Sequence, residues 1–200
     1  MNTQSFAPAS APVACLKSPQ ELIVIDSRVA GIQHLRLERL SSQFTWVILD
    51  TEQDSIFAIS RLLQTYKNIS AIHLIAHGEP GCVHLGKNPL TPESIKYYAH
   101  QIQNWQQFLH AQADILIYGC CVAAQELGLS LLRTLHQLTG ANIAASSTPI
   151  GHQDLGGNWD LDVQLGFIQT SLAISVVLGI ISAAICGTFT QVPDALNVQP

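Results

Sequence analysis

The chain has 200 residues, of which 48% are hydrophobic and only 12% are charged. A chain of this length can form one sizeable core, and its apolar content excludes an intrinsically disordered protein. Fourteen acidic and nine basic residues give a formal net charge of −5. No basic run is present, which argues against a surface that neutralises nucleic-acid phosphates. We therefore expect a single domain that does not bind nucleic acid.

The cysteines and the N-terminus indicate a reducing compartment. Five cysteines are an odd number, two of them are adjacent, and no CxxC motif occurs, so the set is a poor disulfide framework. Residues 1–19 have no charged leading segment and no long apolar run, so we expect a disordered leader and no classical signal peptide. A lipoprotein cleavage site at Val13–Cys15 is the weaker alternative. The predicted location is cytoplasmic or membrane-associated.

In the first half of the chain, compact apolar runs alternate with segments of helical periodicity. In chain order we expect a strand at Glu21–Asp26, a weakly helical segment at Val29–Leu40, a strand at Phe44–Asp50, a helix capped by Asp54 and running to Tyr66, and a strand at Ser70–Ala76. The Gly- and Pro-rich stretch that follows this third strand is typical of a loop with a small hairpin.

The second half continues the same alternation. Its expected elements are a helix capped by Thr91 and running to about His110, a strand at Asp114–Gly119, a helix at Glu126–Leu138, a short strand at Asn142–Ser146, and an alternating segment at Gly156–Gly166. Strands that alternate with helices predict an α/β fold with a mostly parallel central sheet flanked by helices. We assign this domain to residues 20–166.

The segment 167–189 is apolar and uncharged, and residues 190–200 form a tail. Its length of about 20 residues is that of a membrane-spanning helix. Its β-branched residues and its polar Gln169, Thr170 and Ser171 also suit a buried last strand that runs into an apolar tail, and no Lys or Arg flanks it to set an orientation. Membrane anchor and buried strand both stay open.

In an open parallel sheet, sites form beyond the carboxyl ends of the strands. Here these ends carry Asp26, Asp50, His77 and Cys120. If the third and fourth strands are neighbours, His77 and Cys120 lie about one strand spacing apart. A cysteine nucleophile needs a base or a cation nearby, and an imidazole can supply either. The backbone N–H groups of Gly78 and Cys120 are then candidate donors to an oxyanion.

Structural alternatives exist for several of these residues. Cys120 could be a small buried hydrophobe, and Asp50 and Asp54 fit best as caps of the helix that follows them. The potential zinc ligands are His73, His77, Cys82, His84, Cys120 and Cys121. His73 and His77 share one strand face but would stand about 13 Å apart, too far to bind one ion. The remaining set is irregular, so we expect neither a metal nor a cofactor.

Two stretches, HLIAHGEPG at His73–Gly81 and ILIYGCCVA at Ile115–Ala123, resemble the two catalytic signatures of caspase-like (clan CD) cysteine peptidases. Together with ELIVIDS, ILDTEQDSI, TGANIAASSTPIG and GGNWDLD, they resemble the bacterial domain of unknown function 4347. This second resemblance covers about Glu21–Ser175. That domain often lies at the N-terminal end of large repeat-rich surface or secreted proteins.

The resemblance implies a caspase-like three-layer sandwich in which His77 is the general base and Cys120 the nucleophile. Gly78 and Cys120 would donate to the oxyanion. Asp26 matches an acid that lines the primary pocket of clan members cleaving after Arg or Lys, and Cys121 and Ser146 would also contact substrate. Cys121 stands where the family usually has Asn.

The expected function is that of a cysteine peptidase or self-processing module acting on a peptide or protein substrate. The alternative is a catalytically silent scaffold or binding module of a surface or adhesin-type protein.

Overall fold

The computed structural model describes residues 20–29, 44–151 and 157–170. Within these residues the chain forms one six-stranded sheet in the order β2-β1-β3-β6-β7-β8. Every neighbouring pair is parallel except β7 and β8, which are antiparallel. The strands are β1 (Gln20–Asp26), β2 (Phe44–Leu49), β3 (Ile69–Ile75), β6 (Leu109–Tyr118), β7 (Asn142–Ala145) and β8 (Val163–Leu165). The predicted α/β fold with a mostly parallel sheet is confirmed.

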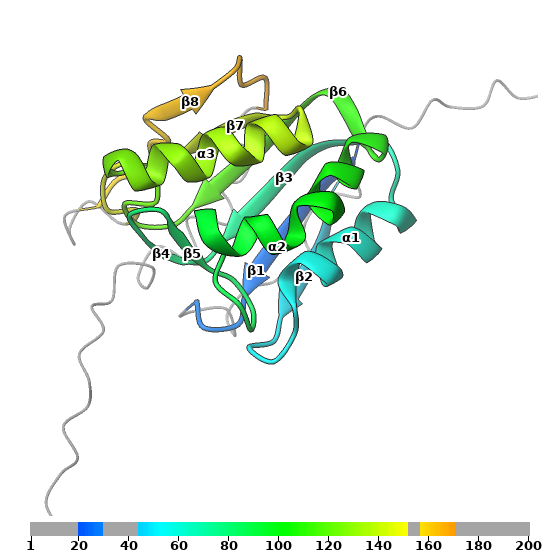
Figure 1. The fold of residues 1–200 in the computed structure, drawn as a ribbon, viewed down its shortest axis with the longest axis horizontal. Coiled ribbons are helices and arrows are strands. Elements are labelled where there is room, and N and C mark those ends of the chain that lie inside the picture. Colours follow the sequence, from blue (N-terminus) through cyan, green and yellow to red (C-terminus); the bar gives the residue numbers. More distant parts are fainter. Residues whose placement is uncertain (1–19, 30–43, 152–156, 171–200) are drawn as a thin grey trace, which may run out of the picture.

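Three helices of the described part lie side by side on one face of this sheet, as Figure 1 shows. They are α1 (Ser55–Thr65), α2 (Pro92–Gln103) and α3 (Gln125–Thr139). Both predicted caps are present, because Asp54 accepts from the N–H of Phe57 and Thr91 forms a capping box with Ser94. The larger hydrophobic core fills the space between these helices and the sheet.

The opposite face of the sheet carries a smaller core. Ile23, Ile25, Ile75, Leu116 and Tyr118 project to this side, where Ile150 and Leu161 from the loops after β7 pack on them. In the part of the chain that the structure describes, this face has no helical cover. The helix expected at Val29–Leu40 falls mainly on residues outside the described ranges.

The end of α2 differs from the prediction. The helix stops at Gln103, continues as a 3-10 turn at Asn104–Gln107, and is followed at once by β6. Trp105 explains the early end, since it is buried and its indole N–H donates to Ser60 Oγ of α1 at 2.8 Å. The expected helix up to His110 is wrong because a contact with a distant helix outweighs local helical periodicity.

The C-terminal part of the domain is tied to the sheet by a buried carboxylate. Asp114 Oδ2 accepts from the N–H of Gln169 at 2.8 Å, and from the N–H and the hydroxyl of Thr170 at 2.7 Å each. No helix among the described residues is long and apolar enough to cross a membrane. Most of the apolar segment 167–189 lies outside those residues, so both interpretations of it stay predictions.

Candidate functional site

The sheet order brings the strand ends singled out above to one edge. Strand β3 lies between β1 and β6, with Ile75 paired to Ile25 on one side and to Tyr118 on the other. His77 and Cys120 each follow two residues after this paired row, beyond the ends of the neighbouring strands β3 and β6. The condition that the third and fourth predicted strands are neighbours is therefore met.

The two segments that follow β3 and β6 touch through glycine. A Cβ atom built on Gly78 would lie 3.1 Å from the carbonyl oxygen of Cys120 and 2.4 Å from a methyl carbon of Val122. A Cβ on Gly119 would lie 3.5 Å from the Cα of Gly78 and 2.9 Å from the same methyl carbon. A side chain at position 78 would clash with Val122 and crowd the Cys120 carbonyl, so glycine at this position allows the close approach of the two segments.

The turn that carries Cys120 is held by the segment after β7. The Cys120 thiol donates to the carbonyl oxygen of Ile150 at 3.6 Å. The N–H of Cys121 donates to the carbonyl oxygen of Thr148 at 3.0 Å. The N–H of Ala123 donates to the carbonyl of Ser146 at 2.9 Å. Cys121 has a φ of 57°, which is the left-handed region that costs most residues energy. The thiol is thus presented on a sharply bent, well-anchored turn.

Ser146 and Cys121 therefore shape the backbone around Cys120. Ser146 is fully buried, and its hydroxyl lies 3.1 Å from that of Thr148 and accepts from the N–H of the same residue. Cys121 is half-buried. The substrate-binding role expected for both residues stays a prediction.

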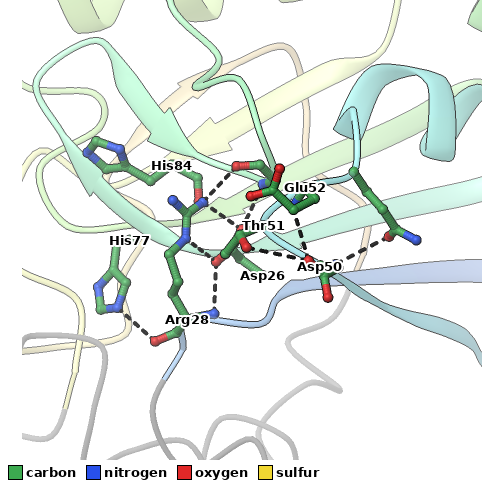
Figure 2. A network of polar contacts seen from close by, with 9 residues as sticks. Asp26, Arg28, Asp50, Thr51, Glu52, His77 and His84 are labelled. Carbon is green, nitrogen blue, oxygen red and sulfur yellow. Dashed lines mark hydrogen bonds and ion pairs between the residues drawn. The ribbon is translucent and has the colours of Figure 1, made fainter.

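A backbone carbonyl sets the tautomer of His77. Its Nε2 lies 3.2 Å from the carbonyl oxygen of Arg28, and Figure 2 draws this contact as a dashed line. A carbonyl oxygen only accepts hydrogen bonds, so we infer that Nε2 carries the hydrogen. With the hydrogen on Nε2, the lone pair of the neutral ring is on Nδ1.

Arg28 also organises the charges at this edge. Its guanidinium binds Asp26 through Nε at 2.7 Å and Nη2 at 2.8 Å, and it donates to the carbonyl oxygens of His84 and Gly86. Burial alone raises the pKa of Asp26, but hydrogen bonds from Arg28 and from the N–H of Gly86, with the guanidinium charge, outweigh it and lower this pKa. Asp26 is therefore an ionised, buried partner of Arg28.

This arrangement bears on the specificity expected from the sequence. The Asp26 side chain is 0% exposed, and its charge is already balanced by Arg28. A basic substrate side chain would have to displace Arg28 to reach this carboxylate. The role of Asp26 in substrate binding stays a prediction, and Arg28 is a site residue that sequence reasoning missed. A buried acid at a strand end needs a cation, and the arginine two residues later was the available signal.

The expected small hairpin is present and adds a second cluster. Strands β4 (His77–Glu79) and β5 (Cys82–His84) are antiparallel. Glu79, Cys82 and His84 offer ligand atoms that all lie within 4.8 Å of one another. Burial, with a smaller contribution from the Glu79 charge, raises the pKa of the Cys82 thiol to about 11. Cys82 is therefore a thiol at neutral pH, and Glu79 is a second residue that sequence reasoning missed.

His73 has a structural position instead. It is fully buried on the smaller core, its Nε2 lies 2.9 Å from Glu21 Oε2, and its ring stacks on Tyr118. It lies within β3 rather than beyond its carboxyl end. Of the histidines considered as zinc ligands, His73 thus belongs to the core of the sheet.

Fold and site together define an α/β domain with a mostly parallel sheet and a cysteine and a histidine beyond adjacent strand ends. The sequence profile of the domain of unknown function DUF4347 matches residues 22–178. The chain belongs to this family. No curated protein matches the chain.

Proposed function

We propose that this domain is a caspase-like cysteine peptidase or self-processing module with Cys120 as nucleophile and His77 as general base. The observation that carries the proposal is the contact of the Gly78 backbone with Gly119 and Cys120, at the ends of two adjacent parallel strands. Two glycines at this contact bring a thiol turn and an imidazole segment to one edge, as covalent catalysis requires.

The chemistry follows from these groups. The thiol proton of Cys120 passes to His77 Nδ1, and the sulfur attacks the carbonyl carbon of the scissile peptide bond. The backbone N–H groups of Gly78 and Cys120 stabilise the resulting oxyanion. Collapse breaks the C–N bond, and His77 returns its proton to the leaving amine. Water then attacks the thioester carbonyl carbon and gives a proton to His77. The C–S bond breaks, His77 returns the proton to the sulfur, and the acid and the free thiol are released.

The contact between His77 and Arg28 supports the assignment of the base. A general base is effective only when its ring is held in one orientation and one tautomer. The Arg28 carbonyl at 3.2 Å supplies this restraint on Nε2. Asp26 fixes Arg28 in turn, through two hydrogen bonds to its guanidinium and one to its N–H.

The test is covalent labelling of the full chain with peptidyl chloromethyl ketones that carry Arg, Lys or Asp next to the warhead. Intact-mass and peptide analysis should find one adduct, on Cys120. Cys120→Ala should abolish it, whereas Cys121→Ala and Cys82→Ala should keep it. Labelling of Cys121 alone would overturn the assignment of the nucleophile. His77→Ala should lower the rate of labelling by at least about tenfold, because general-base catalysis typically contributes 10²- to 10⁴-fold.

A second candidate function is a catalytically silent scaffold or binding module. The neutralised Asp26 favours it, because the acid expected to bind a basic substrate side chain is buried under Arg28. A scaffold predicts that none of the three probes labels the folded chain at a rate above that of its urea-unfolded form. This outcome would exclude the peptidase.

A further inference from the structure

One face of the β4–β5 hairpin carries side chains of the types that serve as metal ligands in proteins. The antiparallel register pairs His77 with His84 and Glu79 with Cys82. Residues two apart on a strand share a face, and directly opposed residues do as well. Glu79, Cys82 and His84 therefore project to the same side. The sequence spacing alone could not indicate this set, because Glu79 joins it only through the register of the hairpin.

The distances fit a single tetrahedral ion. His84 Nε2 lies 3.8 Å from Cys82 Sγ and 3.2 Å from Glu79 Oε1. Zinc with ordinary bond lengths to sulfur, nitrogen and oxygen, at tetrahedral angles, separates these atom pairs by about 3.6 Å and about 3.3 Å. Both distances from His84 thus already stand near those of such a site, and the Cys82 and Glu79 ligand atoms lie within 4.8 Å of each other.

The hairpin is also held rigidly and is open to solvent on one side. Its backbone is anchored by Gly81 N–H to Val122, by two hydrogen bonds between Val83 and Leu90, and by Arg28 to the His84 carbonyl. The Cys82 residue is buried, whereas the Glu79 side chain is 62% exposed and that of His84 is 29% exposed. An ion can therefore reach these side chains from the exposed side.

We propose that Glu79, Cys82 and His84 form a binding site for a divalent transition-metal ion of the zinc class, with one position left for water. Thiolate, imidazole and carboxylate are the ligands that zinc takes in proteins, and binding of the ion would displace the thiol proton of Cys82 to solvent. This inference goes beyond the proposed function, because none of the three ligands is the proposed nucleophile or base. It revises the expectation of no metal that sequence spacing suggested.

Cobalt titration of the chelator-treated full chain, in a reductant that is not a thiol, tests the site. We expect one Co²⁺ per chain, with the thiolate-to-cobalt absorption band and the visible bands of a tetrahedral ion, and displacement of Co²⁺ by Zn²⁺. Cys82→Ser should remove the thiolate band. His84→Ala and Glu79→Gln should each weaken Co²⁺ binding at least about tenfold. Far-UV circular dichroism and melting of the metal-free variants establish that they are folded.

Two matched variants separate this site from the proposed catalytic pair. Cys120→Ser removes the proposed nucleophile, and His100→Ala removes an exposed histidine of α2. Both should bind Co²⁺ as the unmodified chain does. Loss of the thiolate band in Cys120→Ser with its retention in Cys82→Ser would overturn the proposal in favour of a metal at the catalytic pair. Absence of stoichiometric binding by the unmodified chain would overturn it outright, and neither result depends on peptidase activity.

Discussion

His77 Nε2 lies 3.2 Å from the backbone carbonyl oxygen of Arg28, and the Arg28 side chain is held at the same time by Asp26. The turn after β1 thus connects a buried ion pair to the imidazole of the candidate site. Because Arg28 also donates to the His84 and Gly86 carbonyls, the same side chain fixes the β4–β5 hairpin.

Replacing Asp26 by Asn should destabilise the fold in a pH-dependent way. The Asp26 side chain is fully buried, so losing its charge leaves Arg28 without its partner and lowers the free energy of unfolding at pH 7 by about 2–3 kcal/mol. Folding lowers the pKa of Asp26, so its stabilisation is complete above the ordinary value of 3.8 and is lost as the pH falls through the lowered pKa.

Urea denaturation of the unmodified chain and Asp26→Asn, from pH 7 downwards, measures this difference. The two free energies of unfolding should converge below about pH 4. A difference that stays constant across this range would contradict the ionised state of Asp26.

Gly78→Ala should destabilise the chain through a steric clash. The new methyl group would lie 2.4 Å from a methyl carbon of Val122 and 3.1 Å from the Cys120 carbonyl oxygen, so the turn must shift, at a cost of about 1–3 kcal/mol. Val122→Ala removes one of these two contacts. In thermal denaturation, the double variant should therefore be more stable than the sum of the two single effects predicts. Strict additivity would show that Gly78 is not packed against Val122.

Cys121 occupies a left-handed backbone conformation, which predicts an unusual order among its variants. Gly has no Cβ penalty there and Asn tolerates the conformation, so Cys121→Gly and Cys121→Asn should raise the free energy of unfolding by about 0.3–1 kcal/mol. The β-branched Cys121→Val should lower it by about 1–2 kcal/mol. Urea melts of the three variants check the order. A Val variant as stable as the Gly variant would contradict the strained turn.

Asp114→Ala should release the segment after β8 from the sheet. The buried carboxylate accepts three hydrogen bonds from Gln169 and Thr170 and one from Asn142, and losing it should cost about 2–4 kcal/mol. Hydrogen exchange should rise by more than tenfold at the amides of Gln169 and Thr170, while amides in β3 change far less. Equal increases at both places would indicate global destabilisation instead. Asp114→Asn keeps one acceptor oxygen, so its free energy of unfolding should lie between those of the unmodified chain and Asp114→Ala.

The alternation of apolar runs and helical segments was enough to predict the α/β class, the mostly parallel sheet, the small hairpin and the caps at Asp54 and Thr91. These features depend on interactions within a few residues or on the burial of one strand face, and residues close together in the sequence determine both. The placement of His77 and Cys120 beyond strand ends could be predicted for the same reason.

Only the tertiary structure decided which groups these residues meet. The Arg28 carbonyl is 49 positions from His77, the Gly86 N–H is 60 from Asp26, and the Thr170 N–H is 56 from Asp114. Such contacts depend on strand order, hairpin register and loop packing, which no local propensity encodes. For this reason the sequence by itself placed Asp26 in a substrate pocket without its partner Arg28, and it omitted Glu79 from the potential metal ligands. Strand order and register, by contrast, bury Asp26 against Arg28 and bring Glu79 beside Cys82 and His84.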